Sequence, residues 1–209
     1  MKALLFAITL CVAQLGAAEK GFTPLFNGKD LSGWQGIGGP TTNWVAKDAI
    51  LSCTGKKGSQ WIATEKEFSN FDLRLEYKIP TDGNSGVFIR APKEGNAWVT
   101  GLEIQVLDDY GPKWKDLKPN QFTAAIYAVQ PPSERATKKA GEWQTLRIRC
   151  TGSKCRVWVN GKQVIKADLA KLAEKVKNVP GLKRTGGFIG LQNHSSPVFY
   201  RNIRIKELK

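Results

Sequence analysis

The stretch FDLRLEYKIPTDGNSGVFIR, residues 71–90, decides the fold class of this chain. Apolar residues occupy every second position from Phe71 to Tyr77, and charged residues fill the positions between them. Such alternation gives a β-strand one apolar face to bury and one polar face. The turn sequence Pro80-Thr81-Asp82-Gly83 ends the run, and alternation resumes at Val87. The stretch therefore predicts two short strands, each half buried.

The same two-residue period recurs through most of the chain, with turn signals such as Asn160-Gly161 between the runs. One segment departs from it, because apolar residues between Ala167 and Lys177 have the spacing of a short amphipathic helix. Many antiparallel strands and one short helix predict an all-β fold, a jelly-roll β-sandwich. The further alternating runs are residues 101–107, 146–149, 156–160, 189–194 and 203–205.

The first residues are typical of a secretory signal peptide. Lys2 supplies the positive start, residues 3–15 are apolar, and Gly16-Ala17-Ala18 provides small residues for cleavage. The apolar run is too short to remain as a membrane span. We therefore expect cleavage near Ala18, a mature single domain of residues 19–209, a periplasmic or secreted location and no stable membrane insertion.

The chain carries 32 Lys and Arg against 18 Asp and Glu, a net charge of +14. Removing Lys2 leaves 31 basic side chains, so the mature charge is 31 − 18 = +13. A nucleic-acid-binding protein would cluster these residues with interleaved aromatics, whereas here they are spread over nearly every segment. This indicates a basic solvated surface and no nucleic-acid partner. Attraction to acidic glycans or anionic cell surfaces is the alternative.

Three cysteines lie beyond the signal segment. Cys150 and Cys155 bracket a four-residue turn between two strand-like runs, so they are expected to face each other across a hairpin. In an oxidising compartment such a pair forms a disulfide when its geometry allows, and otherwise stays as two thiols. Cys53 is expected to be a small buried apolar group.

The polar halves of the strands form an unusual set of side chains. A solvated sheet face can carry such residues by chance, but this set mixes acids, amides, arginine, tryptophan and the only histidine instead of repeating Lys and Thr. Amides and carboxylates bind sugar hydroxyls, and an aromatic ring stacks on a sugar face. The pattern therefore favours a sugar-binding groove. Its members are Glu76, Arg90, Glu103, Gln105, Arg147, Trp158, Gln192 and His194.

Six motifs in order give a specific resemblance: LFNGKDLSGW (25–34), NSGVFIR (84–90), GLEIQVLDD (101–109), GEWQTLRI (141–148), VNGKQV (159–164) and GLQNHSSPVFYRNIRI (190–205). Together they resemble the 3-keto-disaccharide hydrolase domain family over essentially the whole mature chain. The resemblance implies a concanavalin A-like jelly roll. It also implies cleavage of glycosides whose sugar is oxidised to a ketone at carbon 3, downstream of a sugar 3-dehydrogenase.

The implied chemistry needs a base, because a C3 ketone acidifies the C2 hydrogen and the C1 substituent then leaves by elimination, followed by hydration. We expect Glu103, His194 and Arg90 to be catalytic, with Arg90 stabilising the enolate. A surface carboxylate, a loop histidine and a structural ion pair are the respective alternatives. Glu103 and His194 are also candidate ligands of a divalent metal ion, although two ligands do not define a site. Expected sugar contacts are Asn84, Gln105, Asp108, Tyr127 and Gln192.

The chain departs from the family pattern at four positions. Asn193 stands where an aspartate is usual, and Ser195 and Ala124 stand where glycine is usual. Gln144 replaces a common asparagine. The Asn193 change bears most on function, because it removes a carboxylate beside His194. Two other functions stay open: a noncatalytic carbohydrate-binding module of the same fold, and a surface protein that binds polyanions.

Overall fold

The computed structural model describes residues 19–209, so the predicted signal segment lies outside the described residues. The elements, in chain order, are β1 (Thr23–Pro24), β2 (Trp34–Ile37), η1 (Thr41–Asn43), β3 (Trp44–Lys47), β4 (Ile50–Cys53), β5 (Trp61–Phe68), β6 (Phe71–Lys78), β7 (Asn84–Ala91), α1 (Ala97–Thr100), β8 (Leu102–Leu107), η2 (Pro112–Trp114), η3 (Pro119–Gln121), β9 (Gln144–Thr151), β10 (Lys154–Val159), β11 (Lys162–Asp168), α2 (Leu169–Lys175), η4 (Pro180–Lys183), β12 (Gly187–Gln192) and β13 (Val198–Glu207).

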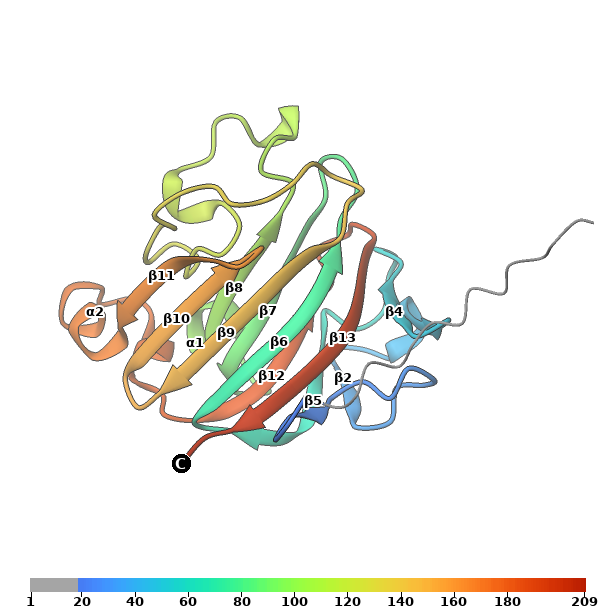
Figure 1. Ribbon diagram of the computed structural model, residues 1–209, viewed down its shortest axis with the longest axis horizontal. Helices are drawn as coiled ribbons and strands as arrows, with labels where there is room; N and C mark the ends of the chain where they lie inside the picture. The colour runs from blue at the N-terminus through green and yellow to red at the C-terminus, as the bar shows by residue number, and fades with distance from the viewer. Residues whose placement is uncertain (1–18) are drawn as a thin grey trace, which may run out of the picture.

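Two antiparallel sheets pack face to face, which confirms the predicted β-sandwich (Figure 1). The first has eight strands, ordered β11-β10-β9-β6-β13-β4-β3 with β1 added beside β13. The second has five strands, ordered β2-β5-β12-β7-β8. The turn after β6 carries the chain from the first sheet to the second, so the two strands of residues 71–90 lie in opposite layers.

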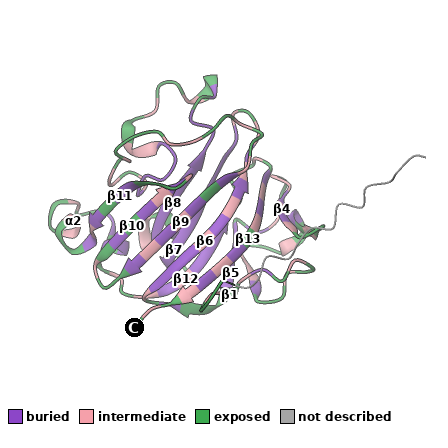
Figure 2. Cartoon of the chain, in the orientation of Figure 1, coloured by how far each residue is buried: buried purple, intermediate pink, exposed green. Residues whose placement is uncertain are grey.

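The core fills the space between the sheets. Alternate residues of β6, including Leu73 and Tyr77, meet Val87 and Ile89 of β7 there, and all four are buried. Figure 2 shows buried residues along the strands of both layers and exposed residues in the connecting loops. The predicted half burial is confirmed for β6, where buried and partly exposed residues alternate from Leu73 to Lys78. It is wrong for β7, which is buried along its whole length, so its outer side is covered as well as its inner side.

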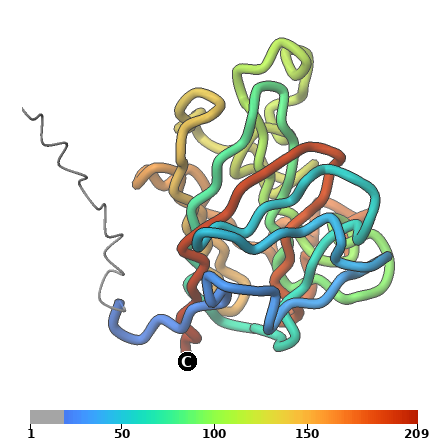
Figure 3. The backbone as a smooth tube through the Cα atoms, turned by 90° about the vertical axis from the view of Figure 1, so that its right-hand side faces the viewer, coloured from blue at the N-terminus to red at the C-terminus, as the bar shows by residue number. Residues whose placement is uncertain are grey.

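The predicted helix is confirmed as α2, which covers Leu169–Lys175 within the expected range 167–177. The single-turn α1, Ala97–Thr100, was not expected, because four residues are too few to show a helical period. Near the described N-terminus, Thr23 pairs with Ile205, and Figure 3 shows this blue segment beside the red C-terminal strand. No helix among residues 19–209 is long and apolar enough to cross a membrane.

Cys150 and Cys155 lie directly opposite each other in the β9–β10 pairing, as the hairpin prediction requires. Both are fully buried and both are free thiols in this structure, as is the buried Cys53. The close approach of the two sulfhydryl groups and their burial raise the pKa of Cys155 well above its ordinary value. Both side chains therefore pack in the hydrophobic core of the sandwich.

Candidate functional site

The structure divides the predicted polar set between two surfaces on opposite sides of the core. Glu103, Gln105 and Gln192 belong to the five-stranded sheet and lie on its outer surface, called here the carboxylate face. Glu76, Arg147 and Trp158 lie on the outer surface of the eight-stranded sheet, called here the arginine face. The prediction of one common hollow is therefore wrong for this second group, because alternation identifies an outward side but not which sheet carries it.

Strand register assembles the carboxylate face. Phe88 pairs with Glu103, and Gly86 pairs with Gln105, across β7 and β8. The Glu103 carboxylate occupies the space above Gly86, where a Cβ atom would overlap it. The missing side chain of Gly86 thus leaves a depression beside the edge strand β8, and the Glu103 carboxylate lies in it.

Glu103 is almost completely buried, with 4% of its surface exposed. Burial raises the pKa of the Glu103 carboxyl from 4.5 to about 8, and its interaction with the Gln192 side chain opposes part of that rise. No arginine or lysine forms an ion pair with Glu103 among the described residues. A carboxyl group in such surroundings can exchange a proton near neutral pH, as a general base or acid must.

Two amide oxygens on strands β7 and β12 of this sheet lack hydrogen-bond donors. Gln192 Oε1 and Asn84 Oδ1 are both buried and unpaired within residues 19–209. Gln105 Oε1 instead accepts the Val106 N–H at 3.0 Å, so its amide nitrogen stays available as a donor. Buried polar groups are normally paired, and unpaired ones mark a place for a ligand or water. Sugar hydroxyls both donate and accept hydrogen bonds, so they fit this set.

Aromatic rings border these polar groups. Trp61 and Phe88 meet edge to face with ring centroids 5.3 Å apart, and the Trp61 ring covers Gly190. A hollow of about 240 Å³ opens beside them, lined by Gln60, Trp61, Phe88, Gly95, Asn96, Ala97, Trp98, Gln192 and Asn193. Sequence reasoning did not select Trp61, Phe88 or Trp98. A signal was present for Phe88, an aromatic residue on the polar side of its strand.

Tyr127 and Asp108 lie at the border of the carboxylate face. The Tyr127 N–H donates to the Glu103 carbonyl at 3.0 Å, and its ring meets Trp98 edge to face. Its hydroxyl accepts from Gln121 Nε2 at 3.1 Å. Asp108 follows β8 and accepts the Asp82 N–H at 3.0 Å, so it holds two loops together. Tyr127 therefore remains a candidate sugar contact, whereas Asp108 has a structural task.

His194 lies in the β12–β13 loop, two residues after Gln192, and is exposed. Among the described residues, His194 forms no ion pair with Glu103, whose pKa is influenced by burial and by Gln192. Its neighbour Asn193 donates from Nδ2 to the carbonyls of Lys56 at 3.0 Å and Ser59 at 3.3 Å. An aspartate cannot donate these bonds, so the departure at Asn193 stabilises the loop contact beside the hollow.

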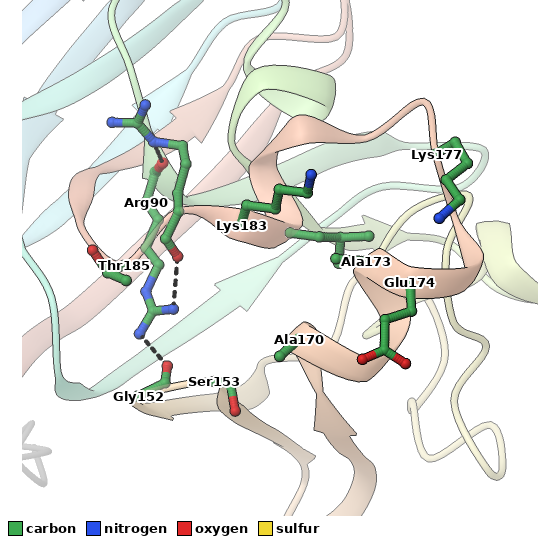
Figure 4. Close-up of a pocket in the computed structure, with 11 residues that line it drawn as sticks. Arg90, Gly152, Ser153, Ala170, Ala173, Glu174, Lys177, Lys183 and Thr185 are labelled. Carbon is green, nitrogen blue, oxygen red and sulfur yellow. Dashed lines mark hydrogen bonds between the residues drawn. The ribbon is translucent and has the colours of Figure 1, made fainter.

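Arg90 does not join the carboxylate face, so its predicted place there is wrong. A positive φ of 51° and an irregular β7–β12 pairing interrupt the alternation of β7 before Ala91. The guanidinium instead donates to the carbonyls of Arg184 at 3.0 Å, Ser69 at 3.0 Å and Gly152 at 2.8 Å. Figure 4 shows this side chain reaching toward Gly152 at the edge of a separate hollow of about 430 Å³. Arg90 thus joins the two sheets.

The predicted divalent metal site lacks a cluster of ligands in the described part of the chain. No group of three or more His, Cys, Asp or Glu side chains is placed to hold an ion there. Glu103 and His194 are not brought together in such a group, so these residues do not fit a metal centre.

Two departures from the family pattern occupy strained backbone positions. Ser195 has φ = 56° and Ala124 has φ = 69°, in the left-handed region that favours glycine. The glycine that the resemblance leads us to expect at these positions would adopt this backbone without strain. Both lie in segments that flank the carboxylate face, since the Ala124 N–H donates to the Gln105 carbonyl at 2.9 Å.

A family model and a named relative agree on the kind of protein that this chain resembles. The model of the 3-keto-alpha-glucoside-1,2-lyase-like domain matches residues 21–206. A 3-keto-disaccharide hydrolase of Bacteroides thetaiotaomicron is 29% identical over 235 residues, spanning 93% of this chain and 81% of that protein.

Solved structures of other proteins have the same β-sandwich fold as this chain. A protein provisionally named a glycosyl hydrolase, from Parabacteroides distasonis, superposes with a TM-score of 0.78 at 32% identity, covering 90% of this chain and 99% of the other. A carbohydrate-binding module from Bacillus subtilis shares the fold alone, with a TM-score of 0.53 at 14% identity over 86% of this chain and 98% of the module.

Proposed function

Because the chain belongs to the family of 3-keto-alpha-glucoside-1,2-lyase-like domains, we propose that it cleaves 3-keto-glycosides, including 3-keto-disaccharides, with Glu103 as the general base. One observation carries the proposal: a nearly buried carboxyl group with a pKa of about 8 lies beside unpaired amide oxygens and an aromatic hollow. The named hydrolase from Bacteroides thetaiotaomicron supports the same substrate class.

The reaction begins at the C2 hydrogen of the oxidised sugar. The C3 carbonyl acidifies this hydrogen, because the electron pair left on C2 delocalises onto the C3 oxygen as an enolate. The Glu103 carboxylate takes the proton and becomes a neutral carboxylic acid. Since burial already favours the neutral form of Glu103, the protonated product state is the one that its surroundings stabilise.

Elimination and hydration complete the cleavage. The enolate electron pair re-forms the C3 carbonyl as the C1–O bond breaks, and the departing oxygen takes a proton from the protonated Glu103 or from water. The alkene between C1 and C2 then accepts water, with the hydroxyl at C1 and the proton at C2. The sum is hydrolysis of the glycosidic bond.

The surrounding groups hold the sugar during these steps. Gln192 Oε1 and Asn84 Oδ1 are acceptors for two sugar hydroxyls, and the free N–H groups of Gln105 are donors for an oxygen that becomes negative. Trp61 and Phe88 present apolar surface to the sugar ring. His194, in the loop beyond Gln192, is a second proton carrier for the departing group.

The test is turnover of a chromogenic 3-keto-glucoside by the mature protein. Glu103→Gln should lower kcat by about 10² to 10⁴, the usual contribution of a general base. Glu67→Gln is the matched control, since Glu67 is exposed on β5 of the same sheet. His194→Ala should lower kcat by a smaller factor.

A substrate deuterated at C2 separates the mechanism from simple binding. Proton abstraction by Glu103 predicts a primary isotope effect, and it predicts solvent exchange at C2 that Glu103→Gln abolishes. Binding of the keto-sugar without product release would instead show a carbohydrate-binding module. Product formation undiminished by Glu103→Gln would overturn the assignment of the base.

A further inference from the structure

Three basic side chains stand in one row across the arginine face. Lys166 pairs with Arg156, and Arg156 pairs with Arg149, so β11, β10 and β9 each contribute one cation. Neighbouring strands are about 4.8 Å apart, and like charges directly opposite destabilise a sheet. The next residue in the row, Asp72 of β6, pairs with Arg149 in register.

The Asp72 carboxylate does not neutralise this row. It accepts from Arg147 Nη2 at 2.6 Å and from Arg74 Nε at 3.2 Å instead. Within residues 19–209, neither Arg149, Arg156 nor Lys166 forms an ion pair. The row therefore carries uncompensated positive charge at a cost to stability, which an external anion would remove.

The surface beside this row is hollowed. A depression of about 300 Å³ is lined by four residues, none of them acidic: Arg149, Thr151, Lys154 and Arg156. A second depression of about 320 Å³ lies farther along β9, where Arg147 covers the Trp158 ring at 4.5 Å. Figure 1 turns this face toward the viewer, with β9, β10 and β11 side by side.

We propose that the arginine face binds an anionic polysaccharide, whose carboxylate or sulfate groups pair with Arg149 and Arg156. A planar guanidinium matches such groups through two parallel hydrogen bonds. Two cations in adjacent strands, with a third beyond them, suit a chain that lies across the strands and carries one anion after another. The polysaccharide is a partner on the side of the molecule opposite Glu103.

Two other polyanions fit the face less well. Single-stranded nucleic acid needs bare aromatic rings for base stacking, but Trp158 is covered by Arg147 and Phe22 by Arg74. An anionic membrane would be met by exposed apolar side chains as well as charge. The large exposed apolar residues among those described, Val45, Trp98 and Tyr110, do not come from β9, β10 or β11.

The experiment measures the Kd of the mature protein for polygalacturonate at low salt, with neutral dextran as the uncharged control. The double variant R149Q/R156Q should bind roughly tenfold more weakly, because two charged contacts are lost. The matched variant K56Q/K57Q removes the same charge from an exposed loop and should bind within about twofold of the original protein. Added salt should weaken binding of the original protein.

A melting measurement shows whether the double variant R149Q/R156Q is still folded, so that weaker binding is not mistaken for unfolding. Removing the repulsion between Arg149 and Arg156 should leave the Tm of R149Q/R156Q equal to or above that of the original protein. Equal weakening by both double variants would show that net charge alone attracts the polymer and would overturn the assignment to this row. Tighter binding to an oligothymidylate or to phosphatidylserine vesicles than to polygalacturonate would overturn the choice of partner.

Discussion

Glu103 on the carboxylate face and Asp72 on the arginine face are both acidic residues inside a strand, and each has 4% of its surface exposed. Their surroundings are opposite. Burial tends to raise the pKa of Asp72 too, but hydrogen bonds and charge from Arg147 and Arg74 outweigh it, so the pKa falls below 3.8. Glu103 has no such partner among the described residues, and its pKa rises to about 8.

The comparison teaches that an acidic residue does not by itself mark a site, whereas a buried acid without a cationic partner beside a hollow does. The arginine face satisfies its acids inside the fold, as Glu76 does with Arg201 at 2.7 Å. The carboxylate face leaves an acid without a cationic partner, and two amide oxygens without donors, beside a hollow. A fold keeps such unsatisfied buried groups at a cost, which is why they cluster at functional sites.

The largest expected effect is the dependence of folding stability on the ionisation of Glu103. A pKa raised from 4.5 to about 8 means that Glu103 favours the folded state fully below pH 4.5, and that this contribution is lost as the pH rises through about 8. The free energy of unfolding should fall over this window by at most about 5 kcal/mol. Urea unfolding from pH 4.5 to 9 should show the decline in the original protein and in Glu67→Gln but not in Glu103→Gln. A decline of equal size in all three proteins would break the comparison.

The raised pKa of Glu103 should also determine how turnover of the 3-keto-glucoside depends on pH. Because a base must be deprotonated, kcat/KM of the original protein should rise with pH and level off above about 8.

The depression over Gly86 provides the second test. A Cβ atom there would overlap the Glu103 carboxylate, so Gly86→Ala should displace the base. Turnover of the 3-keto-glucoside should fall about a hundredfold, the typical effect of a misplacement near 1 Å. Gly141→Ala is not an equivalent control, because Gly141 has φ = 84°. Ser52→Ala, in β4 of the other sheet, serves instead, and a comparable loss there would refute the steric argument.

Breaking the Asp72 pairs should act on stability and not on turnover. Asp72→Asn removes the charge that binds Arg147 and Arg74, and it leaves both arginines at a partly exposed surface. We expect unfolding to become easier by about 2 kcal/mol, below the range for a fully buried pair. Denaturant unfolding measures this, and kcat for the keto-glucoside should stay unchanged. A fall in kcat with unaltered stability would reverse the roles assigned to the two faces.

The smallest expected effect concerns the loop beside the hollow. Asn193→Asp replaces the donor that holds the carbonyls of Lys56 and Ser59 with an acceptor. The loss should be about 1 kcal/mol in the free energy of unfolding, as for a single hydrogen bond. Asn193→Ser, which retains a donor, should lose less. If the aspartate variant were more stable, the structural explanation of Asn193 would be wrong.

Much of the fold follows from local sequence pattern. Alternation at Phe71–Tyr77 and at 101–107 predicts which side chains enter the core, and the spacing in 167–177 predicts α2. The candidate base and its amide neighbours, Glu103, Gln105 and Gln192, were also selected this way. These predictions depend on the period of a single strand or helix, which neighbouring residues in the chain define.

Only the tertiary structure decided which outward-facing residues meet. It placed Glu76, Arg147 and Trp158 on the face opposite Glu103, since sheet membership depends on pairing between distant strands. It also turned Arg90 toward three backbone carbonyls, because one irregular residue reverses the side of every residue after it. The sequence by itself determined the sandwich and its polar strands. Long-range pairing decided which charges are neutralised, and therefore which face remains open to chemistry.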